Sequence, residues 1–346
     1  MSPQSVDLPT LMHREAAEAA DAVQRLTDSN RSRFVQLGKT LRQNPPRAVI
    51  TNARGSSDHA SVYAKYLIST RLGLPVASAT PSISSVYGRD TNVKDWLCLS
   101  VSQSGKSPDI VATAQSMKRT GAYTVALVNA PGSPLAAASD LEISLQAGPE
   151  LSVAATKSYI TSLVGILWLV AEWTEDSELT EQILRLPDML REAWTLDWSS
   201  HFEKLKDCHG LFVIGRGPGL GIANEAALKF KETCQIHAES FSAAECSHGP
   251  LALLGPEFPA LIFSQSDASQ VSVNSLASRM IDLNAPVYLA GSTTPGSTIL
   301  PTLQAHPAIQ PVLMIQSFYR AVADLSLGLG LNPDQPPALK KVTETV

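Results

Sequence analysis

Short apolar runs alternate with helix-like segments along most of the chain, in two sets of three. Each run leads into a polar or glycine-containing loop. With their loops, the six runs are RAVITNARGSSDH (47–59), DWLCLSVSQSG (95–105), AYTVALVNAPGS (122–133), GLFVIGRGPGLG (210–221), PALIFSQSDAS (259–269) and APVYLAGSTTPG (285–296). Buried strands separated by helical segments are typical of parallel sheets that carry helices on both faces. The pattern therefore predicts an α/β fold.

The second set of runs repeats the first set in a single register. Three landmarks recur 162 positions later: Arg54-Gly55 as Arg216-Gly217, Ser102-Gln103-Ser104 as Ser264-Gln265-Ser266, and Val125 as Val287. From this shared interval we infer a tandem duplication of a doubly wound parallel-sheet domain.

The duplication divides the chain into three parts. The stretch HREAAEAADAVQRL (13–26) contains mainly strong helix formers, so we predict a helical segment before the first domain. We expect this N-terminal helical segment at 1–29, the first domain at 30–192 and the second domain at 193–346.

One loop of the first domain has the chemistry of a phosphate site. Gly105-Lys106-Ser107 is similar to the end of a nucleotide-binding P-loop, but Ser100 stands where that motif needs its first glycine. Three hydroxyls, an amide and a glycine before Pro108 suit a single phosphate at a helix N-terminus. Taken alone, the loop could equally be a serine-rich turn. The second domain has Asp267 in place of the glycine, so we expect the first domain to hold the phosphate.

Composition and net charge limit the kinds of binding partner that we expect. The chain has 346 residues, 44% of them hydrophobic and 17% charged, so it can bury a large core. With a net charge of −5 and no basic stripe, we expect no nucleic-acid partner. The most apolar run, SYITSLVGILWLVAEW (158–173), is shorter than a membrane-spanning helix and contains Glu172, so we predict a buried core helix and no membrane association.

The cysteines indicate a reducing environment and no metal. Cys98, Cys208, Cys234 and Cys246 form no C-x-x-C pair, and no secretory signal precedes them, so we expect a cytoplasmic protein. A metal set of Cys234, His237, Cys246 and His248 matches no common zinc spacing.

Five stretches together resemble the sugar isomerase (SIS) domain family, whose members bind phosphorylated sugars in flavodoxin-like domains. They are ARGSS (53–57), SQSGKSPD (102–109), AGPELSVAATKS (147–158), EAALKFKETCQIHAESFSAAECSHGPLAL (225–253) and DQPPALKKVT (334–343). The resemblance spans nearly the whole chain and is strongest to the isomerase half of glucosamine-6-phosphate synthases.

The resemblance implies a role for ten residues. It places the sugar-phosphate site on Ser57, Ser102, Gln103, Ser104, Ser107 and the backbone of Val153. It implies proton transfer by Glu232, ring opening by His248, a Schiff base on Lys341, and a further lysine near C2 of the sugar at Lys229. It implies no metal and no organic cofactor.

Each catalytic candidate also has an ordinary alternative. Glu225, Lys229 and Glu232 have the spacing of a solvated, salt-bridged helix face. His248 could be a structural loop histidine, and Lys341 could lie in a solvated tail.

The chain also departs from the synthase pattern. Ala155 replaces a serine near the sugar, and Pro337 replaces an arginine before the lysine. The chain begins Met1-Ser2-Pro3 and its first cysteine is Cys98, so we expect no release of ammonia from glutamine.

The resulting hypothesis is an amino-sugar phosphate deaminase that converts glucosamine 6-phosphate or an epimer to a ketose 6-phosphate and ammonia. Three alternatives stay open: a phosphosugar aldose–ketose isomerase, a fructosamine-6-phosphate deglycase, and a non-catalytic sugar-phosphate sensor. The resemblance further implies a homodimer with shared active sites, in which His248 reaches the neighbouring subunit. The epimer and any allosteric control are not specified by the sequence.

Overall fold

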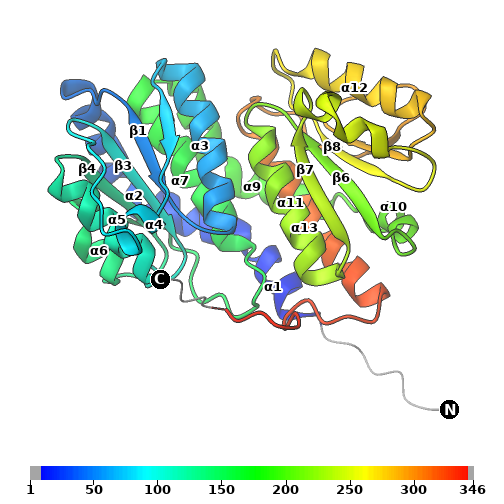
Figure 1. The fold of residues 1–346 in the computed structure, drawn as a ribbon, viewed down its shortest axis with the longest axis horizontal. Coiled ribbons are helices and arrows are strands. Elements are labelled where there is room, and N and C mark those ends of the chain that lie inside the picture. Colours follow the sequence, from blue (N-terminus) through cyan, green and yellow to red (C-terminus); the bar gives the residue numbers. More distant parts are fainter. Residues whose placement is uncertain (1–8, 342–346) are drawn as a thin grey trace.

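Two α/β lobes lie side by side in the computed structural model, which describes residues 9–341 (Figure 1). Each lobe is built on one five-stranded parallel sheet. The first sheet contains β1 (Val49–Asn52), β2 (Val76–Ser78), β3 (Leu97–Ser102), β4 (Tyr123–Val128) and β5 (Leu141–Ser144). The second contains β6 (Gly210–Gly215), β7 (His237–Ser242), β8 (Ala260–Phe263), β9 (Val287–Ala290) and β10 (Thr298–Leu300). The predicted α/β class with two parallel sheets is confirmed.

The two sheets have the same strand order. The first runs β2-β1-β3-β4-β5, and the second runs β7-β6-β8-β9-β10 when read from its other edge. Each sheet therefore places its first two sequential strands in reversed order, which is the doubly wound pattern with a switch point beside the first strand. Val125 on β4 and Val287 on β9 occupy equivalent strands, as the 162-residue interval predicts.

Helices surround both sheets. In the N-terminal part these are α1 (Leu11–Ala17), α2 (Ala19–Gln43), α3 (Ser56–Leu72), α4 (Ser82–Ser85), α5 (Pro108–Arg119), α6 (Pro134–Ala138) and α7 (Lys157–Thr174). The chain continues through α8 (Ser177–Leu184), α9 (Leu186–Thr195), α10 (Ser199–Phe202), α11 (Gly219–Cys234), α12 (Gln270–Asp282) and α13 (Gln310–Gly328). Short 3₁₀ turns occupy Glu203–Leu205, Glu245–His248 and Pro250–Leu253.

The most apolar run of the sequence forms α7, which is buried along nearly its whole length. The prediction of a core helix is therefore confirmed, and none of the helices within residues 9–341 is long and apolar enough to cross a membrane. The expected boundary at residue 30 falls inside α2, which continues to Gln43. Met1-Ser2-Pro3 and the last two residues of the tail motif, Val342 and Thr343, lie outside the described range.

The two lobes meet where α3 of the first packs against α11 of the second (Figure 1). The contact is close because Gly221 on α11 has no side chain. A Cβ at this position would lie 2.8 Å from the carbonyl oxygen of His59 and 3.0 Å from the amide nitrogen of Tyr63. The backbones of the two helices thus nearly touch at the first turn of α11, and Ser56 at the start of α3 contacts Glu225 and Lys229 further along α11.

Candidate active site

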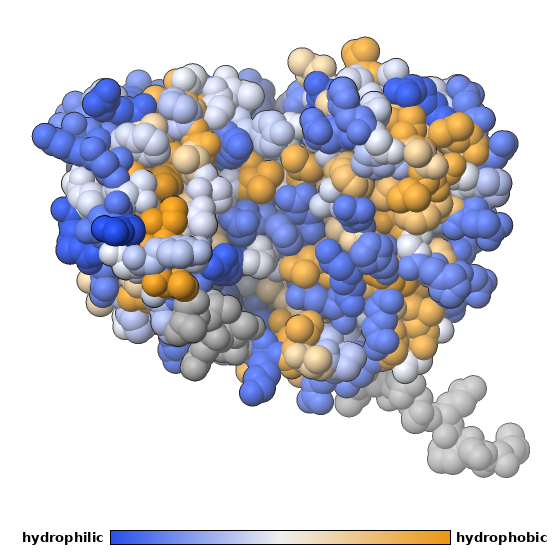
Figure 2. Space-filling view, in the orientation of Figure 1, coloured by the Kyte–Doolittle hydropathy of each residue, from blue (hydrophilic) through white to orange (hydrophobic). Residues whose placement is uncertain are grey.

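A cavity of about 340 Å³ opens at the junction of the two lobes. Its walls come from segments 54–57, 101–107 and 153–162 of the first lobe, from Glu232 on α11, and from tail residues 339–341. Figure 2 shows a hollow between the lobes whose visible walls carry mainly hydrophilic residues. The cavity lies at the carboxyl ends of β1 and β3, where ligands bind in doubly wound sheets.

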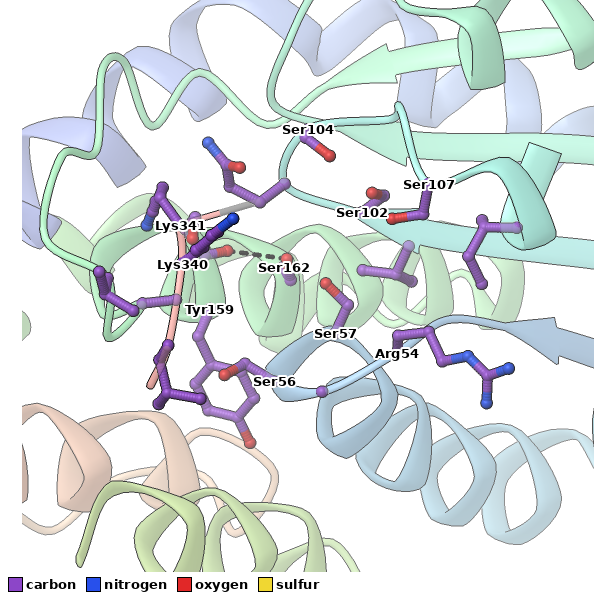
Figure 3. Close-up of a pocket in the computed structure, with 18 of the residues that line it drawn as sticks. Arg54, Ser56, Ser57, Ser102, Ser104, Ser107, Tyr159, Ser162, Lys340 and Lys341 are labelled. Atoms are coloured by element: carbon purple, nitrogen blue, oxygen red, sulfur yellow. Dashed lines mark hydrogen bonds between the residues drawn. The ribbon is translucent and has the colours of Figure 1, made fainter. Parts of the chain in front are cut away.

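The loop after β3 supplies the hydroxyl-rich wall. Gly105 makes this loop possible, because its φ is +61° and a Cβ would lie 2.2 Å from the hydroxyl oxygen of Ser133. The loop leads directly into α5, whose N-cap is Ser107. The side chains of Ser57, Ser102 and Ser107 face the same space in Figure 3. Hydroxyl groups before a helix N-terminus form a suitable site for one phosphate group.

All six residues predicted for the phosphate site line this one cavity: Ser57, Ser102, Gln103, Ser104, Ser107 and Val153. Within the loop, the Ser102 hydroxyl accepts a hydrogen bond from the amide of Gly105 at 3.0 Å. The amide of Val153 instead donates to the carbonyl of Asp334 in the tail at 3.1 Å. Val153 therefore ties the wall of the cavity to the C-terminal segment.

The four catalytic candidates lie in three different settings. Glu232 and Lys341 line the cavity. Lys229 is fully buried behind the wall, where its ammonium donates to Glu232 at 2.6 Å and to the hydroxyl of Ser56 at 3.3 Å. His248 is exposed at the end of a 3₁₀ turn and does not line the cavity. Within this one chain, therefore, the cavity does not include the predicted ring-opening histidine.

Glu225 connects the two lobes behind the cavity. Its buried carboxylate accepts from Ser56 at 3.0 Å and from Tyr319 at 3.1 Å, contacts the His59 ring at 2.9 Å, and pairs with Lys229 at 3.2 Å. Burial by itself raises the pKa of Glu225, but the Lys229 charge and the His59 and Ser56 contacts outweigh it and lower the pKa to about 2. Glu225 and Lys229 thus form a buried ion pair. The alternative of a solvated, salt-bridged helix face is wrong for these two residues.

Sequence reasoning missed two charged groups beside the cavity. Glu150 is buried, and its carboxylate accepts a hydrogen bond from Lys341 at 3.1 Å. Arg54 lines the cavity, and its guanidinium pairs with the buried Asp109 at 2.9 Å. Glu150 stands in the AGPELSVAATKS motif and Arg54 in ARGSS, so both were within recognised stretches. Their contacts join segments that are distant in sequence, and no local pattern reports such contacts.

The equivalent loop of the second lobe, after β8, is filled by side chains of the protein itself. Asp267 accepts hydrogen bonds from the amide and hydroxyl of Ser269 at 2.8 and 2.5 Å, at the start of α12. The side chain of Gln265, almost fully buried, donates to Asp267 and Ser269 and to the carbonyl of Arg216. The protein's own carboxylate therefore occupies the helix start that the first lobe leaves facing a cavity.

Comparison with known proteins gives matches over both lobes. The profile of the SIS domain matches residues 44–171 and 204–299. The curated relatives include glutamine–fructose-6-phosphate aminotransferase (isomerizing) from Sulfurisphaera tokodaii, 29% identical over 96% of this chain and 56% of the relative. The corresponding protein of Thermotoga maritima is 32% identical over 83% of this chain and 50% of the relative. The chain thus spans about half the length of the curated relatives it matches.

Solved structures with a similar fold match nearly the whole chain. A proposed phosphosugar isomerase from Silicibacter pomeroyi is 43% identical and superposes with a TM-score of 0.90, covering 94% of this chain and all of the other. A glucosamine-6-phosphate deaminase from Thermotoga maritima has a TM-score of 0.80 at 20% identity, covering 97% of this chain and all of the other. At that identity the likeness is one of fold.

Proposed function

The chain belongs to the SIS domain family, and on that premise we propose that it is an amino-sugar phosphate deaminase. The proposed reaction converts glucosamine 6-phosphate, or an epimer, to the ketose 6-phosphate and ammonia. One observation carries the proposal: a hydroxyl-rich loop at a helix start and the carboxylate of Glu232 line a single cavity. The loop suits the phosphate of a sugar, and the carboxylate suits proton transfer at the other end of the same molecule.

Glu232 is the proposed base. Lys229 donates to its carboxylate from behind at 2.6 Å, and Glu225 holds Lys229 in turn, so the orientation of the Glu232 side chain is fixed. In the open-chain sugar, Glu232 moves a proton between C1 and C2, which turns the C2 amine into an imine that water hydrolyses. No metal or organic cofactor takes part in this scheme.

The names of the relatives support an amino group in the substrate. The curated relatives are aminotransferases that act with fructose 6-phosphate, and one structural neighbour is a glucosamine-6-phosphate deaminase. Both names combine a hexose 6-phosphate with an amino group. Ring opening is assigned to His248 of a neighbouring subunit in a homodimer, which agrees with the exposure of His248.

A phosphosugar aldose–ketose isomerase is the second candidate. The neighbour that is 43% identical is a proposed phosphosugar isomerase, and proton transfer by Glu232 serves that reaction without an amino group. A substrate panel separates the two functions. Glucosamine 6-phosphate, galactosamine 6-phosphate, a fructosamine 6-phosphate and neutral hexose 6-phosphates are each scored for ammonia and for ketose. We expect ammonia and ketose in equal amounts from an amino sugar; ketose formed only from neutral sugars would refute the deaminase.

A further inference from the structure

Arg54 and Asp109 form an ion pair between the two loops of the proposed phosphate site. Arg54 follows β1, and Asp109 is the second residue of α5. Both Nε and Nη2 of Arg54 lie 2.9 Å from Oδ2 of Asp109. The Asp109 side chain retains 1% of its exposure, whereas that of Arg54 retains 52% and lines the cavity. In Figure 3 Arg54 lies beside Ser57, and its side chain points away from the tail lysines.

The position of Asp109 serves the helix but opposes the ligand. A carboxylate in the first turn stabilises a helix start, and Oδ1 of Asp109 also accepts from the amide of Ile110 at 2.8 Å. The same end of α5 faces the hydroxyl-rich loop, where a phosphate monoester would bring between about 1.5 and 2 negative charges at pH 7. A buried carboxylate at this end repels that anion unless a cation compensates it.

The second lobe has the arginine but not its partner. Arg216 stands 162 positions after Arg54, and the position equivalent to Asp109 is Val271, the second residue of α12, which is 79% exposed. The carboxylate of that lobe, Asp267, lies inside the loop itself and takes the place of an anion. An arginine facing a carboxylate in the first turn of the helix thus occurs in the lobe whose loop opens on the cavity.

We propose that Arg54 is a positioning residue that compensates the charge of Asp109, so that the start of α5 accepts the phosphate of the sugar. Arg54 acts through Asp109 and does not need to contact the phosphate. This assignment rests on the proposed function for the place of the sugar phosphate. It also gives the two members of the pair opposite effects on binding: loss of the arginine weakens it, and loss of the carboxylate does not.

The first test compares the two single variants. Arg54→Gln leaves the buried carboxylate uncompensated, so KM should rise roughly tenfold or more while kcat stays within about twofold of wild type. Asp109→Asn keeps an oxygen for the amide of Ile110 and leaves Arg54 uncompensated, so KM should stay at the wild-type value or fall. A pair that only holds the two loops together would raise KM in both variants, and that result overturns the proposal.

The second test restores the balance of charge. The double variant Arg54→Gln/Asp109→Asn has neither charge, so its KM should return to within roughly threefold of wild type. Arg54→Lys keeps the positive charge with a single donor group in place of the guanidinium, and its KM should stay well below that of Arg54→Gln. A double variant that binds as weakly as Arg54→Gln would show that charge compensation is not the role of Arg54.

Arg216→Gln is the matched control, because it removes the same charge from the equivalent loop of the second lobe. It changes the net charge of the protein by the same amount as Arg54→Gln but faces no carboxylate at the position of Val271. Its KM should therefore stay at the wild-type value. An equal rise of KM in Arg216→Gln and Arg54→Gln would trace the effect to the overall charge of the protein, which also overturns the proposal.

A binding measurement separates this proposal from the proposed function. Fructose 6-phosphate is titrated into each protein and its affinity is read from the rise in the thermal unfolding temperature, with fructose as the probe that lacks a phosphate. If the wild-type protein releases no ammonia from any amino sugar, the deaminase is refuted, yet the order of affinities still tests Arg54. We expect wild type and the double variant to bind more tightly than Arg54→Gln. Equal affinities of wild type and Arg54→Gln, or no binding of fructose 6-phosphate to wild type, overturn the proposal.

Discussion

The two lobes share a strand order but not an open loop after the third strand of the sheet. In the first lobe, Gly105 leaves the start of α5 facing a cavity. In the second lobe, Asp267 turns its carboxylate onto Ser269, before α12. The second lobe therefore carries a built-in anion where the first can receive one.

The two copies of the duplicated fold contribute different groups to the cavity. The lobe whose loop is filled contributes Glu232 and the Glu225–Lys229 pair through α11, which lies across the junction from the open loop. In the proposed function, one copy thus holds the substrate anion, and the other supplies the carboxylate that moves the proton.

Glu225→Gln should have the largest effect, because it breaks the buried junction between the lobes. It leaves Lys229 without its fully buried partner, and breaking such a pair costs about 3–5 kcal/mol in the free energy of unfolding. The pKa of Glu225 lies near 2, below its ordinary value of 4.5, so its contribution is complete above pH 4.5 and is lost as pH falls through 2. Wild-type stability should therefore fall more steeply with acid than that of the variant.

Urea unfolding at neutral and acidic pH measures both effects. Asp21→Asn is the control, since it removes the exposed pair with Arg191 and should cost less than about 1 kcal/mol. Equal losses in the two variants would show that the buried pair does not hold the lobes together.

Glu232→Gln should remove the contribution of the second lobe to the chemistry. The amide keeps the shape but cannot accept a proton, so turnover should fall by a factor on the order of 10² or more with little change in KM. Solvent deuterium incorporation at C1 or C2 of the sugar should disappear. Glu239→Gln, an exposed position on β7, is the control and should keep both rates. Persistent exchange in Glu232→Gln would assign the proton transfer to another residue.

Ser104→Asp gives the first lobe a carboxylate in its loop, as the second lobe already has. Loss of one hydrogen bond to a charged group costs about 1.5–3 kcal/mol, so KM should rise roughly tenfold or more through this loss and charge repulsion. Ser266, the equivalent of Ser104 in the second lobe, is exposed and provides the control. Ser266→Asp should leave KM unchanged. Similar KM values for all three proteins would place the phosphate elsewhere.

Asp267→Ala should have the smallest effect and tests the filled loop. It removes the acceptor for the amide and hydroxyl of Ser269, and loss of such an acceptor at a helix start costs about 1 kcal/mol. Thermal unfolding should register this loss, while KM and kcat stay at wild-type values. A rise in KM would show that the second loop takes part in substrate binding.

Most of the fold was predictable because it depends on patterns local in the chain. The six apolar runs identified six of the ten strands within residues 9–341, and the 162-residue interval identified equivalent strands in the two sheets. The end of α2 was not predictable in the same way. The expected domain start at residue 30 falls inside this helix, which runs on to Gln43 because its apolar face continues to pack against α7.

The site was predictable only in part. The six residues predicted for the phosphate site follow from the motifs of the family resemblance, and they line one cavity in the structure. The burial of Lys229 and its pairing with Glu225 were not predictable, because a charged i, i+4 pair has the same spacing on an exposed and on a buried helix face. The pairing of Glu150 with Lys341 depends on where the tail lies, and that is decided by tertiary contacts.

The tail has one further anchor, at Asp334. Its carboxylate accepts hydrogen bonds from the amides of Leu11 and Met12 at the start of α1, 323 and 322 positions earlier, and its carbonyl accepts from Val153. Synthesis at about 5–20 residues per second separates the appearance of Leu11 from that of Asp334 by about 16–65 s. The amides at the start of α1 therefore lack this acceptor until translation has passed Asp334. The strands of both sheets, the last of which ends at Leu300, are synthesised before Asp334, whereas the part of the cavity wall that consists of residues 339–341 can be added only after it.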